Sequence, residues 1–99
     1  MSRANEVLAC YGELAVTVTR MLELARSRRW DALPALDARC AGLFEELRTM
    51  EPPALSPLER SRVTALSDRI DADRVALDAL VRPQFTRLAA HARELLRAS

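Results

Sequence analysis

The sequence predicts an all-α protein, an antiparallel three-helix bundle whose third helix is kinked or split near Pro83 and continues as a short C-terminal helical segment. Three observations predict this fold. Glycine supplies only 2 of 99 residues, whereas Ala, Leu, Arg and Glu are abundant, and this balance favours helix. Apolar residues recur at steps of three and four in three long segments, and prolines separate them. The length suits one domain over residues 1–99 with a single core.

The first helix is expected over about residues 3–28. One apolar stripe has alternating steps of four and three residues, and a second row runs beside it. The stripe is Val7, Tyr11, Leu14, Val18, Met21 and Ala25, and the row is Leu8, Ala15 and Leu22. A face this wide suits a helix that contacts two others.

The second helix is expected over about residues 31–50. Asp31 is placed to cap it, and Pro34 falls in the first turn, where a missing N–H is harmless. Its apolar series is Leu33, Leu36, Cys40, Leu43, Leu47 and Met50, widened by Phe44. Two prolines, Pro52 and Pro53, end this helix in a linker at residues 51–56.

The third helix is expected over about residues 57–81. "SPLE" predicts Ser56 as the N-cap, Pro57 at the first helical position and Glu59 completing a capping box. Its stripe is Val63, Leu66, Ile70, Asp73, Leu77 and Leu80, and a row of small residues is Ala65, Ala72, Ala76 and Ala79. Asp73 interrupts an apolar stripe, so we expect it to meet a hydroxyl or an Arg of the first helix, to lie solvated at the stripe's edge, or to meet a partner.

A short helical segment is expected after Pro83, over about residues 84–97. The helical step resumes at Phe85, Leu88, Ala92 and Leu95. Arginines outnumber the single acidic residue in this segment, which complements a helix C-terminus and requires no ligand.

Composition excludes several function classes. The formal net charge is +1 and the charges are interspersed, so neither nucleic acid nor an anionic membrane is expected as the main partner. No segment approaches the ~20 apolar residues of a membrane span, and we expect a cytoplasmic protein.

Residues for catalysis or metal binding are scarce. His91 is the single histidine, no metal-type spacing occurs, and no Gly-rich phosphate loop is present. Cys10 and Cys40 are interpreted as buried small hydrophobic residues. Residues 69–83 faintly resemble the first helix of the all-helical chorismate mutases, but the aspartate spacing differs and the chain has no Lys. We therefore expect no enzyme activity, cofactor or metal.

Trp30, the single tryptophan, lies at the joint between the first two helices, and we expect it to cover one end of the bundle. An Arg-rich turn precedes it, and an acidic residue and Leu33 follow. This order, with the leucine ladder of the second helix and Ile70, Asp71, Leu77 and Leu80 of the third, resembles the FliT family of flagellar export chaperones across nearly the whole chain.

The resemblance implies a binding protein. FliT-like proteins hold the C-terminal segment of the filament-cap protein FliD, prevent its self-assembly, and escort it to the export ATPase complex and export gate. In enteric bacteria they also restrain the regulator FlhDC. Some carry a C-terminal helix that folds over the partner groove as a brake. Residues 84–99 either play that part here or leave the groove constitutively open.

The partner groove is expected between the second and third helices. Its candidate residues are Leu36, Cys40, Leu43, Leu47, Leu66, Ile70, Asp73, Leu77 and Leu80, and the floor is expected at Ala72, Ala76 and Ala79. The alternatives are a helical module that forms a homodimer, with no export client, and a type III secretion chaperone of another family.

Overall fold

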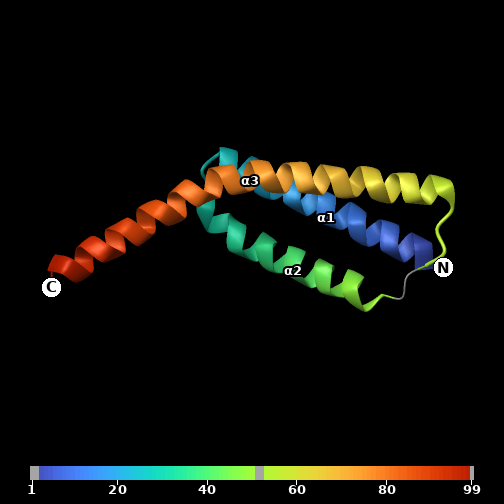
Figure 1. Ribbon diagram of the computed structural model, residues 1–99, viewed down its shortest axis with the longest axis horizontal. Coiled ribbons are helices and arrows are strands. Elements are labelled where there is room, and N and C mark those ends of the chain that lie inside the picture. Colours follow the sequence, from blue (N-terminus) through green and yellow to red (C-terminus); the bar gives the residue numbers. More distant parts are fainter. Residues whose placement is uncertain (1–2, 51–52, 99) are drawn as a thin grey trace.

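Helix α1 (Arg3–Arg26) lies in the middle of the molecule, with α2 (Leu33–Thr49) and α3 (Pro57–Ala98) packed on it (Figure 1). A 3₁₀ turn, η1 (Trp30–Ala32), joins α1 to α2. The computed structural model describes residues 3–50 and 53–98, and no strand occurs among them. The all-α class is therefore confirmed, whereas residues 51 and 52 of the expected linker lie outside the described residues.

The core is built mainly from α1. This helix supplies nine of the thirteen buried apolar residues of the described chain, and α2 and α3 supply two each. The nine are Ala4, Val7, Cys10, Leu14, Ala15, Val18, Met21, Leu22 and Ala25, which include five of the six residues of the predicted stripe. A helix with so wide an apolar face must be covered on two sides, because each of its neighbours shields only one.

The joint between α1 and α2 differs from the one expected. Helix α1 ends at Arg26, and Arg28 adopts a left-handed backbone with φ of 58°. The amide of Arg29 donates to the carbonyl of Leu24 at 2.8 Å, which satisfies one of the terminal carbonyls of α1. Asp31 lies inside η1 and not at the N-cap of α2, because the chain enters α2 through this turn. No side chain caps the start of α2.

Helix α3 begins with the predicted capping box. The amide of Ser56 donates to the Glu59 carboxylate at 2.9 Å, and the amide of Glu59 donates to the Ser56 hydroxyl at 3.2 Å. These hydrogen bonds to Ser56 lower the pKa of Glu59 below its usual value, since they favour the charged carboxylate.

Helix α3 continues through Pro83 without a break and changes direction where it leaves the bundle (Figure 1). Proline removes one helical hydrogen bond and crowds the preceding turn, so a bend at this point has a local cause. The kinked alternative therefore holds, and residues 84–98 form an arm that continues α3 and points away from α1 and α2. Leu95 is 59% exposed and Ala92 is also exposed, while the side chains of Phe85 and Leu88 lie outside the described ones.

Leu14→Ala should lower the free energy of unfolding by about 3 kcal/mol, because Leu14 is 0% exposed and its truncation leaves a cavity at the centre of the core. Urea denaturation followed by circular dichroism measures the change. Val16→Ala is the matched control, since Val16 lies on the same helix but is 64% exposed, and it should change the value by less than about 0.5 kcal/mol. An equal decrease in the free energy of unfolding in the two variants would show that α1 is not the central helix.

Candidate partner-binding groove

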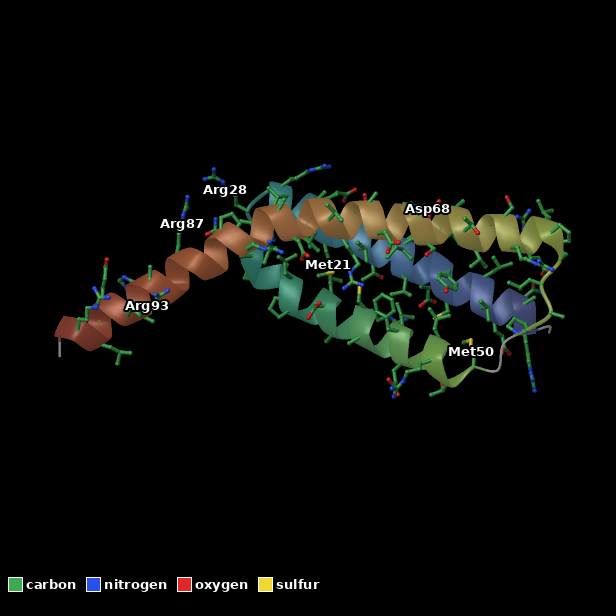
Figure 2. All side chains as sticks on the ribbon, in the orientation of Figure 1. Met21, Arg28, Met50, Asp68, Arg87 and Arg93 are labelled. Atoms are coloured by element: carbon green, nitrogen blue, oxygen red, sulfur yellow. The ribbon has the colours of Figure 1, made fainter. Side chains whose placement is uncertain are left out.

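An apolar groove separates α2 from α3, and α1 forms its floor. Both outer helices pack on α1, but their backbones do not approach each other within the described residues. Two adjoining cavities, of about 620 Å³ and about 250 Å³, lie along this groove. Met21, Asp37, Leu77 and Asp78 border both, so the cavities form one continuous depression. Figure 2 places Met21 between the two outer helices.

Each wall of the groove comes from one face of a helix. Val18 and Met21 of α1 form the floor. The residues of η1 and α2 are Trp30, Leu33, Pro34, Asp37, Cys40, Ala41 and Phe44, and those of α3 are Arg74, Leu77, Asp78, Val81 and Gln84. Most are apolar, which suits an apolar face of another molecule.

Trp30 lies at the end of the groove where the arm departs. It is half-buried, packs against the core, and borders the larger cavity together with Leu33 and Val81. The indole therefore covers the end of the bundle, as expected, and also forms part of the groove.

Arg74 and Phe44 connect the two walls at the smaller cavity. The guanidinium carbon of Arg74 lies 5.3 Å from the centroid of the Phe44 ring, a cation–π contact between α3 and α2. Phe44 remains 39% exposed, so this contact spans the groove at its surface.

The nine candidate residues predicted from the sequence lie on the correct helices but mostly beneath the groove. Four are buried in the core, namely Cys40, Leu43, Ile70 and Leu77. Four more are half-buried and pack against it, namely Leu36, Leu47, Leu66 and Leu80. Of the nine, Leu77 borders both cavities and Cys40 borders the smaller one. Since Ile70 is 4% exposed, a charge introduced there would report on folding before it reported on binding.

Asp73 is explained by a contact with the first helix. The Thr19 hydroxyl donates to the Asp73 carboxylate at 2.8 Å, and Arg69 donates to the same hydroxyl oxygen at 2.7 Å. The expectation that a hydroxyl of the first helix meets Asp73 is therefore confirmed. This network joins α1 to α3 and accounts for a carboxylate in an apolar stripe.

The expected floor of small residues is wrong. Ala76 is half-buried and packs against the core, but Ala72 and Ala79 are exposed, and none of the three borders either groove cavity. Ala79 borders a different cavity with Val75 and Arg82. The floor is α1, because this helix lies between the other two. Sequence reasoning also missed Asp37, Arg74, Asp78 and Val81. These residues belong to two rows that run beside the apolar stripes at steps of four and three. The row on α2 is Asp37, Ala41 and Phe44, and the row on α3 is Arg74, Asp78 and Val81.

The two thiols lie at different depths relative to the groove. Cys40 lines the smaller cavity, with its Sγ 3.8 Å from the Met21 sulfur, whereas Cys10 contacts the Leu43 carbonyl at 3.4 Å. Burial raises the pKa of both thiols, and nearby carboxylates, chiefly Glu46 for Cys10 and Asp37 for Cys40, raise them further.

The described part of the chain offers neither a metal site nor a membrane-spanning helix. There, no group of three or more His, Cys, Asp and Glu side chains is arranged to hold a metal ion. Nor does any helix of that part combine the length and the apolar character needed to cross a membrane.

Comparison with known proteins gives consistent results. Residues 8–98 match the family model described as flagellar protein FliT. Among solved structures, the chain is similar to the crystal structure of flagellar protein FliT from Bordetella bronchiseptica, with a TM-score of 0.76 and 32% sequence identity. The match covers 85% of this chain and 96% of that chain. A comparison with curated proteins finds no match.

Alkylation of both thiols by iodoacetamide at pH 8 should be slow in the folded protein and fast in urea. The raised pKa values leave less thiolate at a given pH, so the rate in the folded protein should rise at higher pH than the rate in the unfolded chain. Mass spectrometry of Cys10→Ser and Cys40→Ser, each with one thiol, assigns the rates. Equally fast labelling in the folded and unfolded states would contradict the burial of these residues.

Proposed function

Since the chain belongs to the FliT family of flagellar proteins, we propose that it is a cytoplasmic chaperone that binds the C-terminal segment of the filament-cap protein FliD. Flagellar export chaperone is the class of function that family membership supports. FliD as the client, prevention of its premature self-assembly, and escort to the export ATPase complex and export gate are the finer parts of the proposal.

The observation that carries the proposal is the open groove between α2 and α3. Its larger cavity, at about 620 Å³, has room for several side chains, and its walls are mainly apolar. An apolar surface left uncovered adds nothing to stability, so a partner that covers it is the physical explanation.

An amphipathic helix fits such a groove. A client's terminal segment that is disordered when free would fold as it laid its apolar face on Met21, Leu33 and Val81. The same apolar face would then be unavailable for self-assembly. Ordering the segment costs several kcal/mol, so affinity in the micromolar range is expected, which suits a chaperone that must release its client.

Val81→Asp should weaken binding of a peptide from the FliD C-terminus at least tenfold in calorimetric titration, which corresponds to about 1.4 kcal/mol. Val81 is half-buried on the groove wall, so the variant places a charge where the apolar face of the client would lie. Val75→Asp is the matched control, because Val75 lies on the same helix, is 72% exposed and borders neither groove cavity.

Circular dichroism must show that both variants remain folded. Unchanged affinity of Val81→Asp would exclude the groove as the site. Absence of heat with the unmodified protein would exclude FliD as the client. If light scattering then showed a stable dimer, the homodimerisation module would replace the chaperone.

Removing residues 87–99 should leave the affinity for the same peptide unchanged within about twofold. The arm points away from the groove, and its described side chains from Ala90 to Arg97 are all exposed (Figure 2). Titration of the truncated and complete chains gives the comparison. Tighter binding by the truncated chain would show instead that the arm acts as a brake.

A further inference from the structure

Two carboxylates border the groove, one from each of its outer walls. Asp37 comes from α2 and Asp78 from α3, and both border the larger and the smaller cavity. They therefore lie at the same level, where the two cavities join. Both residues are exposed.

Within the described part of the chain, neither carboxylate takes part in a salt bridge. The salt bridges found among residues 3–50 and 53–98 join Arg20 to Glu23, Arg39 to Glu13 and Arg48 to Glu45, and none reaches Asp37 or Asp78. Arg39 and Glu13 pair on the side of α1 that faces away from the groove, where Ala9, Gly12 and Val16 also lie.

The one basic residue that borders the groove cavities in the described chain is Arg74. It borders the smaller cavity and not the larger one, and its guanidinium lies over the Phe44 ring. The larger cavity therefore combines apolar walls with two negative charges and no positive one. An occupant with only apolar groups would desolvate both carboxylates without compensation.

The length of the groove limits its occupant. The α2 wall extends from Leu33 to Phe44, which corresponds to about 17 Å of helix. The Arg74–Phe44 contact spans the groove at the far end of this wall. A partner helix of about three turns fits this length, and its middle turn would lie between Asp37 and Asp78.

We propose that the groove selects a client helix of about three turns that carries an Arg or Lys in the middle of its apolar face, held between Asp37 and Asp78. This inference rests on the proposed function, since it specifies the chemistry of the client that the same groove takes. The aliphatic stem of the basic residue packs on the apolar floor while its charged end meets both carboxylates. A helix with an acidic residue at that position is rejected by like-charge repulsion.

The test is a calorimetric titration of the complete chain with the FliD C-terminal peptide at 50 and 300 mM NaCl. Asp37→Asn combined with Asp78→Asn should weaken binding at least tenfold at low salt and remove most of the salt dependence. Asp68→Asn combined with Asp71→Asn changes the net charge equally, but both residues are exposed and border neither groove cavity. This control should bind within twofold of the unmodified protein.

A charge exchange identifies the basic residue. Each Arg or Lys of the peptide is replaced in turn by Glu, and one such peptide should lose binding to the unmodified protein. The same peptide should recover binding to a variant that carries Asp37→Lys and Asp78→Lys, while the unmodified peptide should bind that variant poorly.

The outcomes separate this inference from the proposed function. If the unmodified protein binds the peptide and the Asp37/Asp78 variant binds it equally well with the same salt dependence, the charge selection is overturned and the proposed function stands. If the unmodified protein does not bind the peptide, both are overturned. Light scattering that shows a dimer lost only in the Asp37/Asp78 variant would assign the groove to a second copy of the chain, which also overturns the inference.

Discussion

Burial of α1 between α2 and α3 is the constraint on which the rest of the structure depends. One helix supplies most of the buried apolar residues, so the other two reach stability mainly by packing on it. This arrangement leaves an open angle between the outer helices. The groove is thus a direct result of the distribution of apolar residues, since a more even distribution would draw α2 and α3 together and close it.

Much of the fold could be predicted from the sequence because local signals and the global fold agree. The stripe of α1 and the capping box of Ser56 and Glu59 are both found as predicted. The first residue of α2 was harder to predict than these features. Asp31 has the chemistry of an N-cap residue. However, the left-handed backbone at Arg28 and the turn η1 place it one residue before the N-cap position of α2.

The groove was harder to predict than the helices. Hydrophobic periodicity identifies the residues that face the interior, and it placed Leu43 and Ile70 in the candidate site although both belong to the core. The groove residues that the sequence did not identify, such as Asp37 and Asp78, lie one position to the side of each stripe. Whether such a flanking row is solvated or faces a neighbour depends on how far apart the outer helices lie, and that distance depends on contacts between residues far apart in the chain. The position of Trp30 was easier to predict, because a large aromatic residue at a helix joint has few other places to pack.

Two sulfur atoms meet where the floor of the groove joins its α2 wall. Met21 is unbranched and has three rotatable bonds, and its sulfur lies 3.8 Å from that of Cys40. If the groove binds a client as proposed, an unbranched thioether in its floor would adapt to apolar side chains of different shapes. Met21 is only 6% exposed, so its sulfur is protected from oxidants while the protein is folded. Conversion of Met21 to its sulfoxide would place a polar group in this apolar floor and so weaken the packing of any apolar side chain against it.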